Sequence, residues 1–172
     1  FTLQSDAYGS WTLVEQVPIE RYLLGVVPYE IGANAPVSAM AAQAVLARTW
    51  ALANSHRFAV DGYHLCSTTQ CQVYKDPSKA GLRVTKAIAE TSGKVLTWKR
   101  KPIHAVYHAT NGGVVASGDE AWDMQSVPYL EAKIDGSFDL IDRFNLPFKS
   151  KAAVKAFLFE REEVFGKSHH LF

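Results

Sequence analysis

The stretch from Asn34 to His56 reads NAPVSAMAAQAVLARTWALANSH, and it decides the fold of this chain. Alanine recurs throughout it, and alanine has the highest intrinsic helix propensity. Asn34 can cap a helix, and Pro36 fits its first turn because the N–H that proline lacks has no partner there. Small side chains let neighbouring backbones approach closely. The stretch therefore predicts a central helix that is buried on several sides.

Shorter elements are predicted on both sides of this helix. Residues 1–17 carry short β-type runs and are expected to form a strand pair. Pro18 opens a short amphipathic helix that should fail near Pro28. Further helices are expected at about 77–92, ending at Gly93, and at about 150–164, and residues 95–98 and 103–109 are expected to pair as a hairpin. Helices and short strands in mixed order favour an α+β fold, which we expect to form a single domain over residues 1–172.

The composition is that of an ordinary globular protein. Apolar residues make up 48% and charged residues 20%, and 18 Lys and Arg residues balance 17 Asp and Glu residues. This near-neutral charge argues against a nucleic acid as partner, because nucleic acids are recognised first by positive charge. No apolar run approaches the length of a membrane span. The chain begins at Phe1 rather than Met, which we interpret as a processed or recombinant chain from which any export signal has been removed.

Glu30 is the first candidate for chemistry. It follows the apolar run from Leu23 to Tyr29, at the expected end of a helix. Apolar surroundings disfavour the charged form of a carboxyl group, so its pKa rises and it can donate a proton near neutral pH. A general acid that cleaves a glycosidic bond needs this property. The alternative is an exposed glutamate at a helix terminus.

The irregular segment 61–74 holds a second candidate site. His64, Cys66 and Cys71 supply one imidazole and two thiols, a ligand set that suits zinc. The spacing of the cysteines is wide for a zinc site, and no fourth ligand is evident nearby. A disulfide in an exported protein is an equally weighted alternative, followed by free thiols. We lean slightly towards zinc, because a disulfide alone would have no use for His64.

Polar and aromatic residues elsewhere are candidates for contacts with a substrate. Polar side chains that interrupt the alanine-rich helix either brace a site or face solvent. Aromatic rings stack on sugars but more often pack in a core, and a glycine turn lets backbone N–H groups approach a ligand. The candidate substrate-binding residues are Gln43, Arg48, Thr49, Tyr74, His108, Asn111, Gly112 and Trp122.

Several blocks of sequence, taken together and in order, resemble the stage II sporulation protein D and amidase enhancer family. The blocks are residues 21–30, 42–51, 66–74, 89–96 and 108–113, followed by 120–122 and 128–130. The resemblance covers about residues 18–130, which we expect to be the family-like core. Residues from about 135 to 172 match less clearly and are expected to be a C-terminal extension without a catalytic role.

The resemblance implies a lytic transglycosylase in which Glu30 is the catalytic carboxylate. Sporulation members of the family cleave glycan strands stripped of stem peptides, between N-acetylmuramic acid and N-acetylglucosamine. Glu30 would protonate the glycosidic oxygen and then, as a carboxylate, accept the proton of the muramic acid C6 hydroxyl, leaving a 1,6-anhydro end. A second carboxylate is not required, unlike in a glycoside hydrolase. No cofactor is required either, although the resemblance permits a structural zinc ion at the cysteine block.

The resemblance also implies an alternative function. Other members are described as enhancers of a cell-wall amidase, so a non-catalytic glycan-binding or amidase-activating module is the second interpretation. Expected partners are peptidoglycan glycan strands and, in the second role, an amidase, and the expected location is the bacterial cell envelope outside the cytoplasm. Ile31 and Gly32 follow Glu30 where many relatives have a Met-Pro type of continuation. We therefore expect the loop after the carboxylate, and its contacts with substrate, to differ from those of these relatives.

Overall fold

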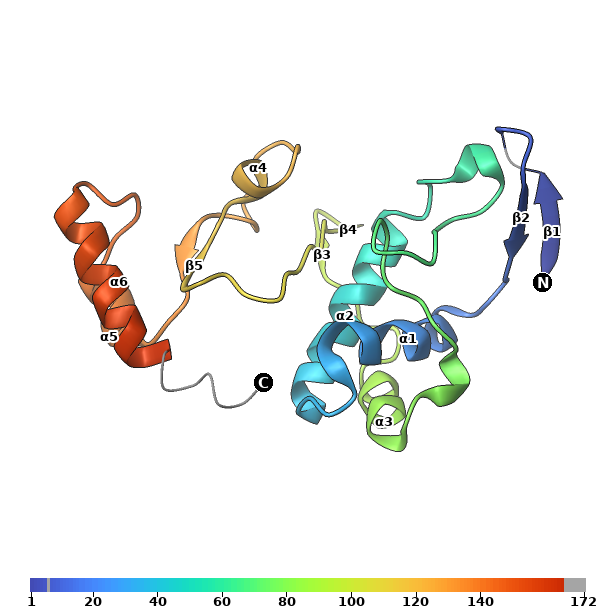
Figure 1. The fold of residues 1–172 in the computed structure, drawn as a ribbon, viewed down its shortest axis with the longest axis horizontal. Coiled ribbons are helices and arrows are strands. Elements are labelled where there is room, and N and C mark those ends of the chain that lie inside the picture. Colours follow the sequence, from blue (N-terminus) through green and yellow to red (C-terminus); the bar gives the residue numbers. More distant parts are fainter. Residues whose placement is uncertain (6, 166–172) are drawn as a thin grey trace. The chain divides into compact units, whose positions relative to one another are not determined.

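The computed structural model describes residues 1–5 and 7–165 of the chain. It has helices together with short antiparallel strand pairs, which confirms the α+β class (Figure 1). The chain divides into two compact units, one formed by residues 1–107 and one that begins at His108. Each unit is described by itself below, and a single domain over residues 1–172 stays a prediction. No helix in the described part of the chain is long and apolar enough to cross a membrane.

Three helices form the core of the first unit. They are α1 (Ile19–Val27), α2 (Val37–Ala53) and α3 (Leu82–Glu90), and each packs against the other two (Figure 1). Ala44 and Ala47 of α2 are fully buried, so the prediction of a central, alanine-rich helix is confirmed. The buried residues of this core are Tyr22, Leu23, Val26, Val27, Met40, Ala44, Ala47, Ala51, Val84, Ala87 and Ile88.

Helix α1 ends as predicted and continues into a wider turn. Its last residue is Val27, and Pro28–Gly32 form a single π-helical turn. Pro28 has no N–H to continue the α-helical ladder, which accounts for the change of geometry at this position. Single π-helical turns inside or after α-helices occur often at functional sites. Glu30 lies in the middle of this one.

Gly25 lets a distant segment lie directly on α1. The backbone N–H of Lys75 donates to the carbonyl oxygen of Gly25 at 3.0 Å. A Cβ at Gly25 would collide with the ring of Tyr74 and with the Lys75 carbonyl. Only glycine therefore permits this approach, which brings residues 72–75 alongside the end of α1.

The other two helices of the core begin differently from the prediction. Asn34 does not cap α2; Pro36 holds the N-cap position, without a side-chain hydrogen bond. The helix expected at 77–92 is divided, because Ala80 and Gly81 adopt extended backbone between a 3-10 turn (Pro77–Lys79) and α3. The helix α3 also ends at Glu90, two residues before the predicted end, and Gly93 follows in a turn with a positive φ of 70°.

Two strand pairs belong to the first unit. Strands β1 (Thr2–Ser5) and β2 (Trp11–Val14) pair antiparallel as predicted. Strands β3 (Thr97–Trp98) and β4 (Lys101–Pro102) form a hairpin in which Thr97 lies opposite Pro102. The predicted strand at 103–109 is wrong: the tight turn at 99–100, with positive φ at both residues, closes the pairing at 101–102.

The second unit has its own small core. Strands β5 (Val114–Val115) and β6 (Lys133–Ile134) pair antiparallel. Short helices α4 (Gly118–Ala121) and α5 (Phe138–Arg143) were not predicted, whereas α6 (Lys151–Phe165) confirms the predicted last helix. Ile134, Leu140 and Phe157 form the buried centre of this unit.

Candidate active site

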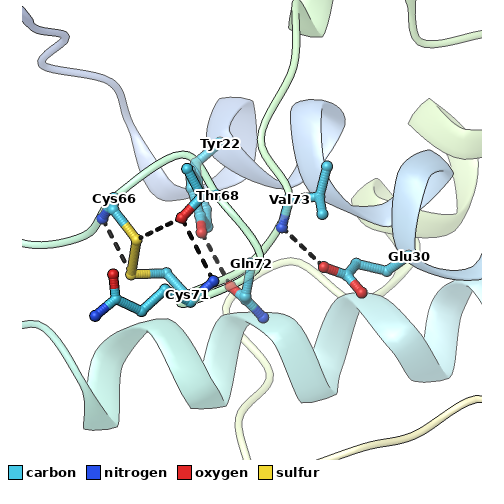
Figure 2. Close-up of a disulfide and its surroundings, with 8 residues drawn as sticks. Tyr22, Glu30, Cys66, Thr68, Cys71, Gln72 and Val73 are labelled. Atoms are coloured by element: carbon cyan, nitrogen blue, oxygen red, sulfur yellow. Dashed lines mark hydrogen bonds between the residues drawn. A yellow bond between two sulfur atoms is a disulfide. The ribbon is translucent and has the colours of Figure 1, made fainter.

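Glu30 lies half-buried in the π-helical turn and faces the segment that follows the cysteines. Its Oε1 accepts a hydrogen bond from the backbone N–H of Val73 at 2.9 Å (Figure 2). It is therefore not the freely exposed glutamate of the alternative interpretation. A carboxylate held by a backbone N–H has a defined direction, which a proton-transferring group needs.

Two buried side chains, Tyr22 and Gln72, and the half-buried Tyr107 form a chain of hydrogen bonds. The Tyr22 hydroxyl donates to Oε1 of Gln72 at 3.0 Å, and Nε2 of Gln72 donates to the Tyr107 hydroxyl at 3.1 Å. The Tyr107 hydroxyl at the end of these hydrogen bonds is close enough to Glu30 for the charge of the carboxylate to act on it. Gln72 is only 1% exposed. Figure 2 shows the hydrogen bond between Tyr22 and Gln72 and, beside it, the one between Val73 and Glu30.

The hydroxyl groups of Tyr22 and Tyr107 have raised pKa values. Burial raises the pKa of Tyr107, and the nearby negative charge of Glu30 raises it further. The Gln72 hydrogen bond and the Gln43 side chain lower it, without outweighing the first two causes. Burial also raises the pKa of Tyr22, with smaller contributions from Tyr107, Glu30 and Tyr74. Both hydroxyls therefore keep their protons near neutral pH; that of Tyr22 donates to Gln72, and that of Tyr107 accepts from Gln72.

Cys66 and Cys71 are joined as a disulfide, which is one of the two equally weighted alternatives. Their Cα atoms lie 5.8 Å apart, and the Cys66 N–H donates to Sγ of Cys71 at 3.1 Å (Figure 2). The Cys71 N–H donates to the Thr68 carbonyl at 3.0 Å, which tightens the loop. Since Gln72 and Val73 follow Cys71 directly, this loop fixes the two residues that reach the site.

The disulfide form does not fit the predicted zinc ion. Both sulfur atoms are bonded to one another, so neither Cys66 nor Cys71 offers a thiolate to a metal. Among the described residues, no group of three or more His, Cys, Asp or Glu side chains is arranged to hold a metal ion. Zinc ligation by His64, Cys66 and Cys71 therefore stays a prediction for the reduced protein alone.

Gln43 lies next to this site with an unused donor. The residue is 7% exposed, and its Nε2 is buried without a hydrogen-bond partner. It lies close enough to Tyr107 to favour the ionised form of that hydroxyl, yet it does not meet the geometry of a hydrogen bond. Because an unpaired buried amide costs about 1 to 3 kcal/mol, the position of Gln43 calls for an acceptor from outside.

Arg48 and Thr49 brace the fold. The guanidinium of Arg48, 1% exposed, donates to both carboxylate oxygens of Glu20 at 2.9 and 2.7 Å and to the Lys94 carbonyl at 3.0 Å. Thr49 Oγ1 donates to the Val45 carbonyl and accepts from the Leu96 N–H at 3.0 Å. These contacts favour the bracing role over direct contact with a substrate.

Tyr74 packs within the first unit. Its ring stacks on Tyr22 with centroids 5.3 Å apart, and its hydroxyl donates to Glu15 at 2.8 Å. Burial and the hydrogen bond to Glu15 raise the pKa of Tyr74 to about 12. Of the two roles expected for aromatic residues, this geometry favours packing.

The remaining candidate residues lie in the second unit. His108 is exposed, and Trp122 is 38% exposed after helix α4. Asn111 braces a turn: its Nδ2 donates to Asp135 at 2.6 Å, and its Oδ1 accepts from the Gly113 N–H at 2.8 Å. Gly112 adopts a positive φ of 63° in this turn, which confirms the predicted turn. Their contact with substrate stays a prediction.

Tyr22, Gln72 and Tyr107 were missed as site residues by sequence reasoning. Tyr22 lies at an apolar position of a helix, and Tyr107 ends an apolar run, so both read as core residues. Gln72 had one usable signal, since it directly follows Cys71 and any closure of the cysteine loop would fix its direction. No local pattern indicates that the three residues meet.

Comparison with known proteins identifies the family of this chain. The sequence profile of the family described as Stage II sporulation protein (SpoIID) matches residues 7–98, more than half of the chain. Stage II sporulation protein D of Bacillus subtilis (strain 168) is 35% identical over 136 residues, which cover 69% of this chain and 39% of that protein. The protein named Amidase enhancer from the same organism is 39% identical over 113 residues, 66% of this chain and 15% of that protein.

A third relative, an uncharacterized protein of Brachyspira hyodysenteriae (strain ATCC 49526 / WA1), is 35% identical over 124 residues, 69% of this chain and 32% of that protein. The chain thus spans less than half of the length of each of these relatives. The matched residues 7–98 include Glu30, the disulfide and Gln72. The chain belongs to the stage II sporulation protein D family.

Proposed function

We propose that this chain acts on the bacterial cell wall as a peptidoglycan lytic transglycosylase, with Glu30 as its catalytic residue. The observation that supports the proposal is the carboxylate of Glu30, which is half-buried and held by the backbone N–H of Val73. The substrate would be glycan strands without stem peptides, cleaved between N-acetylmuramic acid and N-acetylglucosamine outside the cytoplasm. No cofactor takes part.

The proposed reaction needs a single carboxyl group in two protonation states. Protonated Glu30 gives its proton to the glycosidic oxygen, and the bond from that oxygen to C1 of muramic acid breaks. The carboxylate that remains accepts the proton of the C6 hydroxyl while the C6 oxygen bonds to C1. Water is not consumed, and each turnover returns Glu30 to its protonated form. The N–H donor of Val73 stabilises the carboxylate between the two steps.

Gln43 is the substrate-binding residue that the structure supports best. Its buried Nε2 has no partner, and its side chain lies near Tyr107, on which the charge of Glu30 acts. A hydroxyl or N-acetyl oxygen of the glycan would supply the missing acceptor. Binding would then recover the free energy that the free protein loses by leaving this donor unpaired.

Activation of a cell-wall amidase is the second candidate function. It is supported by the relative named Amidase enhancer, which is 39% identical to this chain. An activator would bind glycan or the amidase without chemistry at Glu30. The two functions therefore differ in whether the purified chain alone forms new glycan ends.

Digestion of denuded glycan strands, followed by mass spectrometry of the fragments, tests the proposal. We expect each new end to be a 1,6-anhydro-muramic acid. Mainly reducing ends would identify a hydrolase and require a second carboxylate. No new ends from the chain alone, together with faster stem-peptide release when an amidase is added, would identify the activator.

A further inference from the structure

Lys75 presents a positive charge at the edge of the candidate active site. Its backbone lies two residues after Val73, whose N–H donates to Glu30 at 2.9 Å, and its own N–H donates to the Gly25 carbonyl at 3.0 Å. Its Nζ lies 4.9 Å from the centroid of the ring of Tyr29, the residue directly before Glu30. Both the backbone and the ammonium group of Lys75 are therefore placed against the turn that carries the carboxylate.

The charge of Lys75 is not neutralised by a neighbouring carboxylate. None of the ion pairs that the described residues form includes it. The carboxylate of the next residue, Asp76, accepts a hydrogen bond from the Ser78 N–H at 2.9 Å. Lys75 is exposed and Tyr29 is 37% exposed, so a ligand can reach both the ammonium group and the ring.

An ammonium group at this position suits a substrate that carries a negative charge near its reacting bond. Of the two sugars in a glycan strand, only N-acetylmuramic acid has an acidic group, the lactyl carboxylate. It is attached through C3 of the same ring whose C1 reacts in the proposed cleavage. In intact peptidoglycan this carboxyl group is an uncharged amide, because it is bound to the stem peptide. A free lactyl carboxylate therefore marks a strand from which the stem peptide has been removed.

We propose that Lys75 binds the free lactyl carboxylate of N-acetylmuramic acid and so makes this site select denuded strands. This inference rests on the proposed function, because it assigns a subsite for the same substrate. Lysine offers a carboxylate three N–H donors on a flexible stem. The cation–π contact with Tyr29 restricts that stem in the free protein, which reduces the entropy lost when the carboxylate binds.

The test compares two glycans that differ only at the lactyl group: denuded strands, and the same strands with each lactyl carboxylate converted to the uncharged carboxamide of the same shape. In the wild type we expect kcat/KM for the formation of anhydro ends to be roughly tenfold higher on the free carboxylate. This is the lower end of the range for hydrogen bonds to charged groups, because Lys75 is exposed. Lys75→Gln should remove the preference by lowering kcat/KM on the free carboxylate alone.

Matched variants separate this role from a general effect of charge. Lys75→Arg keeps a positive charge and should retain most of the preference. Lys86→Gln makes the same change of charge as Lys75→Gln at a side chain that is 70% exposed on α3, and it should keep the wild-type preference. The backbone hydrogen bond from Lys75 to Gly25 does not involve the side chain, so each variant at Lys75 should keep the fold. A Lys75→Gln variant that retains the full preference, or a wild type that does not distinguish the two strands, would overturn the proposal.

A binding measurement without cleavage keeps this inference distinct from the proposed function. Isothermal titration calorimetry with both strands is carried out on Glu30→Gln and on the double variant Glu30→Gln with Lys75→Gln. We expect Glu30→Gln to bind the free carboxylate roughly tenfold more tightly than the carboxamide, and the double variant to bind both equally. If this preference depends on Lys75 but the wild type forms no anhydro ends, the proposed reaction fails and the subsite stands. If anhydro ends form and the double variant keeps the preference, the reaction stands and the subsite fails.

Discussion

The backbone N–H of Val73 lies 2.9 Å from Oε1 of Glu30, although 43 residues separate them in sequence. Two further contacts hold the same segments together: the Lys75 N–H donates to the Gly25 carbonyl at 3.0 Å, and Nζ of Lys75 lies 4.9 Å from the centroid of the Tyr29 ring. The end of helix α1 and the segment after the disulfide therefore form one structural element around the carboxylate.

Replacing Glu30 by glutamine tests the catalytic assignment. Glutamine keeps the size of the side chain and an oxygen that accepts from Val73, but it has no proton to give. We expect the formation of anhydro ends to fall at least about a hundredfold, the usual scale of acid–base catalysis, with an unchanged melting temperature. The assay is fragment mass spectrometry on denuded glycan.

Glu90→Gln is the matched control for this experiment. Glu90 is an exposed carboxylate on α3 that pairs with Lys86 at 3.8 Å, and its replacement should leave cleavage unchanged. Near-normal cleavage by Glu30→Gln would show that the catalytic carboxylate is elsewhere or that the chain is not an enzyme.

The long elements of the first unit could be predicted because their signals are local. Prolines at 18 and 28 delimit α1, and the alanine-rich run specifies α2. The hairpin was predicted at the wrong place because its register depends on the two-residue turn at Lys99 and Arg100. Both residues have a positive φ, which sequence usually indicates by a glycine, and neither of them is glycine. A shift of pairing by a few residues then removed the strand expected at 103–109.

The site was predicted in part for the same reason. Glu30 and Gln43 lie in continuous sequence blocks, whereas Tyr22, Gln72 and Tyr107, which hydrogen-bond one another, come from three separate segments. Arg48 looked like a binding residue because a charge in an alanine-rich helix is unusual. Its partner Glu20 lies 28 residues earlier, and no periodicity connects the two positions.

The disulfide predicts a joint loss of stability and activity when it is removed. Replacing Cys66 and Cys71 by serine should lower the free energy of unfolding by about 2 kcal/mol, the chain-entropy value for so short a loop. Activity should fall further than stability explains, because Gln72 and Val73 lose their fixed position. Urea unfolding and the glycan assay would measure the two effects.

Thiol and metal analysis of the purified protein distinguishes a disulfide between Cys66 and Cys71 from zinc ligation by the same cysteines. We expect no free thiol in the denatured protein until a reductant is added. About one equivalent of zinc together with two titratable thiols would instead support ligation by His64, Cys66 and Cys71, and a chelator should then lower the melting temperature.

The two buried glutamines predict opposite responses to the same substitution. Gln43 leaves Nε2 unpaired, whereas Gln72 uses both ends of its amide. Gln43→Leu should leave the free energy of unfolding unchanged or slightly higher while raising KM for glycan. Gln72→Leu should lower the free energy of unfolding by about 2 kcal/mol, because Tyr22 and Tyr107 lose their shared partner.

Urea unfolding and steady-state kinetics of these two variants form a matched pair. Each variant replaces an almost fully buried glutamine, so differences in volume and exposure are small. A large loss of stability in Gln43→Leu would show that its amide is satisfied in solution. An unchanged KM in that variant would remove Gln43 from the glycan site.

The Glu20–Arg48 pair predicts how stability depends on pH. Burial of Glu20 opposes ionisation, but the hydrogen bonds from Arg48 and Gly93 outweigh it and lower the pKa of Glu20 below its ordinary value of 4.5. Between the folded-state pKa of Glu20 and about pH 4.5, the unfolded chain therefore binds more protons than the folded protein. The free energy of unfolding falls as the pH drops through this range. The contribution of the pair is complete above about pH 4.5 and is lost as the pH falls through the lower, folded-state value.

Glu20→Gln should therefore destabilise the protein most near neutral pH. Arg48 is 1% exposed, so losing its partner leaves a buried charge, and the cost should be on the order of 2 kcal/mol after allowance for the partly exposed Glu20. Below pH 4 the wild type loses the same contribution, so the difference between wild type and variant should shrink.

Glu160→Gln is the control, because its partner Arg143 has a side chain that is 60% exposed and such pairs contribute less than about 1 kcal/mol. Urea unfolding at pH 7 and at pH 3.5 measures both differences. An equal cost of Glu20→Gln at the two pH values would show that the carboxylate charge does not stabilise the buried Arg48.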